Sequence, residues 1–278
     1  MNYRTKHYLF FYSKFILFTV ILLGTVYSCK NEVSQPTSTL LNAQTDSILT
    51  WINTAKTENQ TSEERSVFLL KALHAAIERK KDSVKLIYLS KIQWAYLELG
   101  DSLSFRHTNK LSAELAKELG DSLRIAGRYW DLAYFLDKNN VKDSAFYFYA
   151  QAEKIYNKKG KLLNVGIILN EMGKIQSEVK DYTGAEINVT RAVELLKPQE
   201  KELELHHAYN LLGIIAKDLK EYERALNYYT TANYYLQKLE NSEVLELSVN
   251  NNIGVVHKEK GDYKKATAYF EKVIAYMQ

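Results

Sequence analysis

The stretch NNIGVVHKEKGDYKKATAYF, residues 251–270, contains the pattern that decides the fold. A helical segment is interrupted at Gly261-Asp262, and a second helical segment then carries Ala266 four residues before Phe270. Residues four apart lie on the same face of a helix, so this small residue and this aromatic residue face the same neighbour. The stretch therefore predicts a helical hairpin with a small residue at its seam, the contact surface between its two helices.

The hairpin recurs along the chain with a period of 40 or 41 residues. Small residues twelve apart occur four times, as Gly254 with Ala266, Gly213 with Ala225, Gly173 with Ala185, and Ala133 with Ala145. Four residues after the second small residue stand Phe270, Tyr229, Val189 and Tyr149. Small residues let two antiparallel helices approach closely, and the larger residue one turn later fills the remaining gap. A fixed period indicates stacked units that bury their apolar faces against one another.

Two further hairpins precede these four. Residues 82–99 and 101–119 predict a degenerate copy, with Gln93 and Phe105 at the two small positions. The segments TDSILTWINTAK and SEERSVFLLKALHAAIERK predict a first pair, in which Thr61 or Ser62 caps the second helix and Glu64 is the capping partner. The low proline and glycine content, 2 and 11 residues, agrees with an all-α chain of about six helix pairs over residues 45–278.

These spacings resemble those of the tetratricopeptide repeat family, whose helix pairs carry a small residue, an aromatic, an alanine and a further aromatic at similar intervals. The period is longer than the usual repeat of about 34 residues, which predicts longer helices. The resemblance implies a right-handed α-solenoid. It also implies that the first helix of each pair forms the inner, concave wall and that a protein or peptide binds there.

The N-terminal segment has the order of a signal peptide. Residues 1–14 are basic without any acid, residues 15–26 read FILFTVILLGTV, and Cys29 precedes the polar run KNEVSQPTST. The apolar run is shorter than the ~20 residues that span a bilayer. The segment resembles a bacterial lipoprotein signal, although Tyr27 is larger than the usual residue there. The resemblance implies a signal peptide at 1–28, lipidation of Cys29, a polar tether at 29–44, and a membrane-anchored, extracytoplasmic protein, periplasmic or at the cell surface. An uncleaved anchor and a buried helix are the alternatives.

Composition excludes several classes of site. Cys29 is the single cysteine, so the chain cannot form an internal disulfide or a thiolate metal site. His206 and His207 are adjacent and point about 100° apart on a helix, so they cannot share a metal. We expect no cofactor and no metal.

The charge balance argues against nucleic acid as a partner. The formal net charge is +4, but Arg4, Lys6 and Lys14 precede the apolar run. The remainder of the chain is therefore nearly neutral and lacks the positive field that nucleic acid binding needs.

The tetrapeptide Gly-Asp-Ser-Leu occurs at residues 100–103 and 120–123 and resembles a lipase and esterase signature, with Ser102 and Ser122 in the place of the nucleophile. That family supplies its base in an Asp-x-x-His sequence, and no histidine here has an aspartate three residues before it. Each copy also follows a helical run. We therefore interpret the glycine as a helix terminator and the next residues as the cap of the following helix, and we predict no enzymatic activity.

A recurrent asparagine is the strongest binding signal. Three residues before the first small residue stand Asn170, Asn210 and Asn251, with Trp130 and Ser90 in earlier copies. An asparagine side chain carries a donor and an acceptor and can bind the backbone of an extended peptide. The predicted peptide-binding residues on this face are Trp130, Tyr134, Asn170, Lys174, Asn210, Lys217, Asn251 and Lys258. Alternatively, each asparagine bonds within its own hairpin or is merely tolerated.

These patterns predict an exported, membrane-tethered scaffold that binds a protein or peptide in its groove. A second hypothesis starts from Phe270, Val273 and Ile274, which the repeat pattern directs toward a further unit. In this hypothesis the chain is the N-terminal input domain of a signalling receptor, followed by a membrane span and a DNA-binding regulator or histidine kinase. A homodimer that covers the same apolar end is a further alternative.

Overall fold

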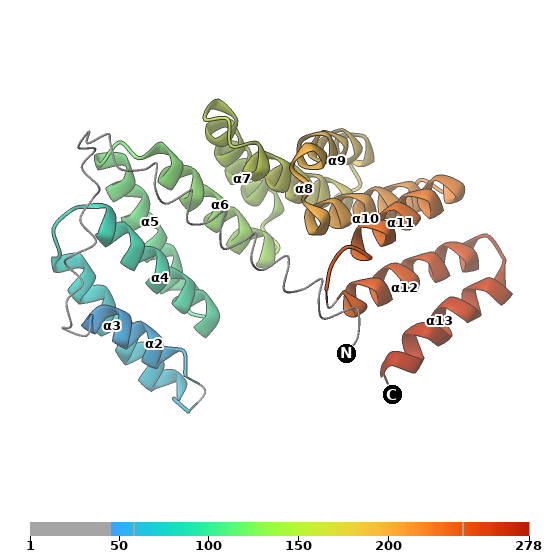
Figure 1. Cartoon of the computed structure of the whole chain (residues 1–278). Coiled ribbons are helices and arrows are strands. Elements are labelled where there is room, and N and C mark those ends of the chain that lie inside the picture. Colours follow the sequence, from blue (N-terminus) through green and yellow to red (C-terminus); the bar gives the residue numbers. More distant parts are fainter. Residues whose placement is uncertain (1–45, 58, 241, 278) are drawn as a thin grey trace, which may run out of the picture. The chain divides into compact units, whose positions relative to one another are not determined.

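The computed structural model describes residues 46–57, 59–240 and 242–277, which form twelve α-helices and no strand (Figure 1). The predicted signal peptide, Cys29 and the tether lie outside these residues. None of the described helices has the length and hydropathy needed to cross a membrane. The helices are α2 (Ser47–Ala55), α3 (Ser62–Glu78), α4 (Ser83–Leu99), α5 (Ser102–Glu118), α6 (Ser122–Lys138), α7 (Lys142–Lys158), α8 (Leu162–Glu178), α9 (Tyr182–Leu196), α10 (Glu202–Asp218), α11 (Tyr222–Leu236), α12 (Glu243–Glu259) and α13 (Tyr263–Met277).

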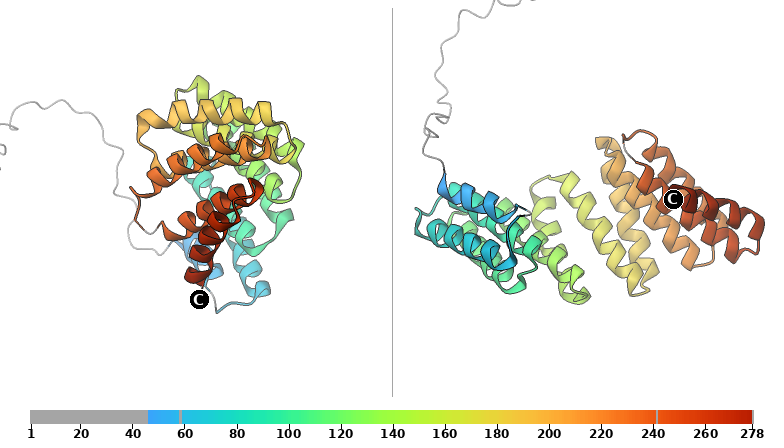
Figure 2. Two further views of the ribbon diagram at one scale, coloured as in Figure 1. Left: turned by 90° about the vertical axis from the view of Figure 1, so that its right-hand side faces the viewer. Right: turned by 90° about the horizontal axis from the view of Figure 1, so that it is seen from below.

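The helices pack as six consecutive pairs, α2 with α3 through to α12 with α13. Each pair also packs against the next one along the chain, as the two views of Figure 2 show. Among the first helices, α8 also touches α10 directly, and α10 touches α12. The prediction of an all-α repeat of six helix pairs is confirmed.

The long period comes from long helices joined by regularly spaced turns. A residue with positive φ occurs every twenty residues from position 100 to position 220, at Gly100, Gly120, Asn140, Gly160, Lys180, Glu200 and Lys220. From α5 to α8, a helix of 17 residues and a turn of three make one half of a repeat. The helices are thus longer than those of a repeat of about 34 residues, as predicted.

The two Gly-Asp-Ser-Leu segments are such turns. Gly100 and Gly120 have φ values of 82° and 68°, a conformation that costs other residues about 1–2 kcal/mol. The carboxylates of Asp101 and Asp121 each accept a hydrogen bond at 3.0 Å from the backbone N–H three residues later. Ser102 is the first residue of α5. The interpretation of these segments as turns with helix caps is confirmed.

The first pair contains the predicted capping box. The backbone N–H of Thr61 donates to Glu64 Oε2 at 2.9 Å, and the N–H of Glu64 donates to Thr61 Oγ1 at 3.2 Å. Two N–H groups at the start of α3 that lack partners within the helix are satisfied in this way.

Small residues close the seams of the last pairs as the repeat pattern predicts. A methyl group added at Gly213 would overlap the ring of Tyr229, and one at Gly254 would lie 2.6 Å from Cε1 of Phe270. Tyr229 is fully buried and belongs to the same apolar cluster as Val249 of the following pair. Tyr229 therefore packs within the seam of its own pair and also contributes to the apolar contact with the following pair.

The pair α4–α5 closes its seam differently. Gln93 is fully buried, and its Oε1 accepts hydrogen bonds from Asn109 Nδ2 at 3.2 Å and from Arg128 Nη1 at 3.3 Å. Its Nε2 donates to Asp131 Oδ2 at 2.9 Å, and this carboxylate also pairs with Arg128 Nη2 at 2.8 Å. Asn109 stands where the following repeats have Tyr149, Val189 and Tyr229. A buried polar network replaces the packing of a small residue against a large one.

Candidate binding site

A hollow of about 400 Å³ lies between two consecutive first helices, α8 and α10. Residues with polar side chains form most of its wall, and two apolar residues of α10 complete it. The lining residues are Asn170, Glu171, Lys174, Ser177, Glu178, His207, Asn210, Leu211 and Ile214. The structure thus brings Asn170, Lys174 and Asn210 of the predicted set together in one place.

The two asparagines in the hollow differ in their partners. Asn170 Oδ1 is buried and accepts no hydrogen bond from any described residue. Asn210 Oδ1 accepts a hydrogen bond of 3.1 Å from Nδ2 of Asn252 in the next first helix. An unpaired buried acceptor costs about 1–3 kcal/mol, so a donor that reaches Asn170 would be bound favourably.

Asn251, the third predicted asparagine, is exposed and does not line the hollow. Successive residues of a helix point about 100° apart. One face of each first helix is turned toward the preceding first helix and another face toward the following one, so the residues that make these two contacts stand at different positions of the repeat. For this reason Asn252, which follows the predicted residue, makes the contact with Asn210.

Charges of both signs line the hollow. Asp137 of α6 is buried and accepts hydrogen bonds from Lys142 at 2.6 Å and from Lys174 at 2.8 Å. Burial alone would raise the pKa of Asp137, but the two lysines hold it below its usual value. Burial raises the pKa of Glu171, whose Oε2 lies 3.8 Å from Lys174 Nζ. The ammonium of Lys174 is held between these two carboxylates at the edge of the hollow.

The other predicted residues also lie on first helices but do not line this hollow. The half-buried Trp130 packs its ring 6.0 Å from that of Tyr156, and Tyr134 packs its ring 5.8 Å from that of Trp94 on α4. Trp94 extends the aromatic surface across two pairs. It stands at the same repeat position as Tyr134 and Lys174, and the prediction missed it because it did not extend this position back to the degenerate pair.

Lys217 and Lys258 are the remaining predicted cations. Lys217 forms an ion pair with Asp218, the next residue of the same helix. Lys258 is exposed, and no ion pair of this residue with another described residue is present. Lys174 is therefore the predicted lysine whose position is fixed by contacts between units.

The adjacent histidines point to different surroundings, as expected for neighbours on a helix. His206 is buried with Nδ1 3.3 Å from the carbonyl oxygen of Ala232, and burial lowers the pKa of His206. His207 lines the hollow. Among the described residues, no cluster of histidine, cysteine and acidic side chains suits a metal ion.

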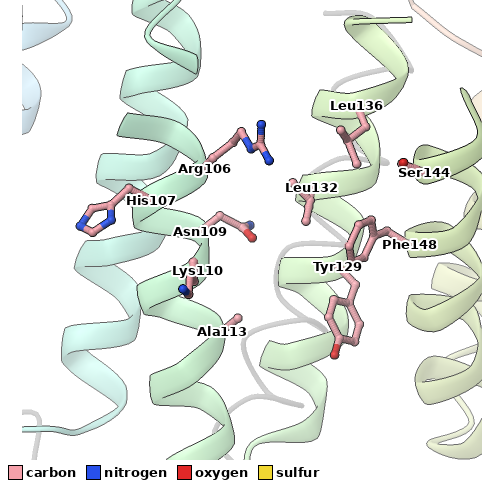
Figure 3. Close-up of a pocket in the computed structure, with 10 residues that line it drawn as sticks. All are labelled: Arg106, His107, Asn109, Lys110, Ala113, Tyr129, Leu132, Leu136, Ser144 and Phe148. Atoms are coloured by element: carbon pink, nitrogen blue, oxygen red, sulfur yellow. The ribbon is translucent and has the colours of Figure 1, made fainter. Parts of the chain in front are cut away.

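A larger cleft, of about 520 Å³, lies between α5, α6 and α7 (Figure 3). The sequence did not predict it. Asn109, which lines it, was the available signal, because it interrupts the column of large residues that the later repeats share.

The family model described as tetratricopeptide repeat matches residues 206–235 and 247–276. Both ranges join a first helix to its second helix, and the same helix pair occurs throughout the described residues. Residues 206–235 and 247–276 are thus tetratricopeptide repeats. No curated protein matches the chain significantly.

Solved structures share the fold at low identity. BtubC from P. vanneervenii is 22% identical with a TM-score of 0.66 over 83% of this chain and 92% of its own. A signal transduction ATPase with numerous domains that has a tetratricopeptide repeat sensor, from Pyrococcus horikoshii, is 18% identical with a TM-score of 0.64, over 82% and 38%. A Rap protein complexed with Competence and Sporulation Factor is 16% identical with a TM-score of 0.58, over 82% and 64%. These likenesses concern the tetratricopeptide repeat fold.

Proposed function

We propose that the chain is a membrane-tethered scaffold that binds an extended segment of a partner protein along its first helices, centred on the hollow between α8 and α10. The observation that carries this proposal is the unpaired Oδ1 of Asn170 in a wall built from equivalent positions of two repeats. A backbone N–H of the bound segment would donate to this oxygen.

The charges of the hollow suit a peptide backbone with side chains of both signs. Lys174, which Asp137 holds in place, presents its ammonium group there. Glu171 and Glu178 present carboxylates, of which that of Glu178 also pairs with Lys142. The helices hold these groups in place before binding, so little conformational entropy is lost on the scaffold side. A Rap protein of the same fold is known in a complex with Competence and Sporulation Factor, which supports the proposal at the level of the fold.

Affinity capture from detergent-solubilised membranes tests this binding. The described domain would be immobilised as the parent and as the variant Asn170→Ala/Asn210→Ala. We expect the variant to recover its main partner at least fivefold less, since two hydrogen bonds of about 1 kcal/mol each are lost.

The matched control is Asn251→Ala, because Asn251 is exposed and lies outside the hollow. It should recover the partner as the parent does. Equal recovery by all three proteins would contradict a role of the hollow in binding.

We also propose that Cys29 carries a lipid that tethers the repeats to a membrane on the extracytoplasmic side. The support is the order of basic residues, apolar run and cysteine in residues 1–29. Labelling of cells with a radioactive fatty acid should mark the parent protein and not Cys29→Ser. Equal labelling of the two would contradict the proposal.

The alternative in which this chain is the input domain of a signalling receptor stays a prediction. The exposed Ile274 and Tyr276 on α13 favour a further contact of this helix. A reading frame that continues into an apolar span would support the receptor, and a stop codon directly after residue 278 would contradict it.

A further inference from the structure

The cleft between α5, α6 and α7 is separate from the hollow between the first helices. It is built mainly on second helices, with α6 as its floor and α5 and α7 as its walls (Figure 3). No residue lines both sites. Its volume of about 520 Å³ lies in the range of protein sites that bury a ligand.

The cleft exists because Asn109 interrupts the column of large residues. The later repeats place Tyr149 and Tyr229 at this position, and both rings are fully buried. Asn109 is smaller, and its side chain is only 4% exposed. Its Nδ2 donates to Gln93 and to the carbonyl oxygen of Arg128, whereas its Oδ1 accepts no hydrogen bond from a described residue. In Figure 3 the amide points from α5 toward α6, into the cleft.

The floor and the far wall are apolar. Leu132 and Leu136 of α6 extend toward the cleft, and Phe148 of α7 closes the opposite side (Figure 3). The Phe148 ring lies 5.9 Å from that of Tyr129. These side chains are only partly buried by the rest of the chain, so a ligand that covers them gains about 25 cal/mol per Å² of apolar surface.

The near wall is cationic. Arg106 and Lys110 are exposed on α5, one turn apart, and no carboxylate lines the cleft. Arg106 makes no ion pair within the described part of the chain, and its guanidinium extends toward α6 (Figure 3). Lys110 lies 3.9 Å from the exposed Glu114, a contact that solvent weakens. The positive charge of this wall is therefore available to a ligand.

We propose that this cleft binds an acidic amphipathic helix of a partner protein. Apolar side chains spaced i, i+3, i+4 and i+7 would insert between α5 and α7 against Leu132, Leu136 and Phe148. Carboxylates beside that stripe would pair with Arg106 and Lys110. A polar hydrogen at the buried end would donate to Asn109 Oδ1. This surface is independent of the site on the first helices, so the chain would hold two partners or two segments of one partner.

Fluorescence polarisation with labelled helical peptides tests the proposal. The probes are a set of amphipathic peptides of about five turns with Leu or Phe on one face and Glu on the flanks, and the same set with Lys in place of Glu. We expect the Glu set to contain micromolar binders and the Lys set to bind at least tenfold more weakly. Arg106→Glu/Lys110→Glu should reverse this preference.

Two matched variants separate the cleft from general electrostatics. Lys154→Glu/Lys158→Glu makes the same change in charge at exposed residues of α7 outside the cleft and should leave the preference for Glu peptides intact. Phe148→Ala should weaken the best Glu peptide at least fivefold. Circular dichroism would confirm that each variant is folded.

Three results would overturn the proposal. The first is that no Glu peptide binds at about 1 mM. The second is that both charge-reversal variants lose binding equally. The third is that dodecanoate binds and shifts the NMR signals of Leu132 and Leu136 while the peptides do not, since the cleft would then accept a small amphiphile and not a helix.

Discussion

The pairs α4–α5 and α10–α11 are both helical hairpins with a turn of positive φ, at Gly100 and Lys220, yet they close their seams by different interactions. In α10–α11 the ring of Tyr229 packs directly against Gly213, and van der Waals contact closes the space between the two helices. In α4–α5 the equivalent positions carry Gln93 and Asn109, which bond to each other and to the next pair. One backbone period therefore accepts an apolar seam or a polar one, and the polar seam leaves a cleft beside it.

A second substitution accompanies the polar seam. Phe105 stands where later repeats have Ala145 and Ala185, and it is fully buried. Its ring stacks on Phe135 of α6 at 4.7 Å. Part of the volume that is lost at Asn109 is thus restored one turn earlier on the same helix, while the other end of the seam stays open as the cleft.

A single substitution should lower the free energy of unfolding more in the polar seam than in the apolar seam. Arg128 and Asp131 have side chains that are 9% and 13% exposed. Asp131→Ala leaves the guanidinium buried without its partner, and we expect the free energy of unfolding to fall by about 3–5 kcal/mol in urea titrations. The double variant Arg128→Met/Asp131→Leu should recover most of this loss, since it removes both charges. A loss below about 1 kcal/mol in the single variant would contradict the buried network.

The apolar seam should be sensitive to volume and not to charge. Gly213→Ala places a methyl group against Tyr229, and we expect a loss of about 1–3 kcal/mol in the same titration. The matched control is Gly127→Ala, where the nearest atom to the added carbon is the Tyr156 hydroxyl at 3.6 Å. This change should stabilise α6 by up to about 1 kcal/mol. Similar effects of the two substitutions would contradict a close approach at Gly213.

A fall in pH should lower the free energy of unfolding through protonation of His206 in the pair α10–α11. Burial lowers the pKa of His206, so the unfolded chain binds its proton more readily than the folded chain. The stability that depends on neutral His206 is complete above the unfolded pKa of about 6.5 and is lost as the pH falls from that value to the folded pKa. Urea titrations at a series of pH values should show a smaller fall between neutral and mildly acidic pH for His206→Gln. An unchanged pH profile in this variant would assign the effect to other groups.

The smallest expected effect concerns the turns, which both regions share. Lys220 holds a left-handed conformation, with φ of 64°, that glycine adopts without strain. Lys220→Gly should therefore raise the free energy of unfolding by up to about 1 kcal/mol, and Gly100→Ala should lower it by about 1 kcal/mol. Opposite signs in thermal unfolding would support the common turn geometry, and a loss in both would contradict it.

The sequence was most informative where one residue type has one physical role. Gly213, Gly254 and the Gly-Asp turns predicted the helix pairs because close approach and positive φ restrict the choice of residue. It was less informative for the polar seam. From the sequence, Gln93 was interpreted as a degenerate copy of the small residue. Its hydrogen bond to Asp131, 38 residues away, occurs in one of the described repeats alone and therefore leaves no periodic pattern in the sequence.

The candidate site was predicted in its location but not in its details. Asn170, Lys174 and Asn210 line the hollow, whereas Asn251 lies outside it, because contact between neighbouring helices depends on their relative rotation. Glu171 and His207 were missed for the same reason. The hydrogen bond that fixes Lys174 against Asp137 also joins two different pairs, and no spacing within one repeat predicts it.

Site-specific photo-crosslinking tests the central claim most directly. A benzophenone amino acid would be placed at Ile214 in the hollow, and in a second protein at Ile187, which is exposed on α9 outside both sites. Each protein would be irradiated with solubilised membranes. We expect one discrete protein adduct from position 214, its loss with Asn170→Ala/Asn210→Ala, and none from position 187. The same adducts from both positions, or an adduct at 214 that persists in the asparagine variant, would contradict binding in this hollow.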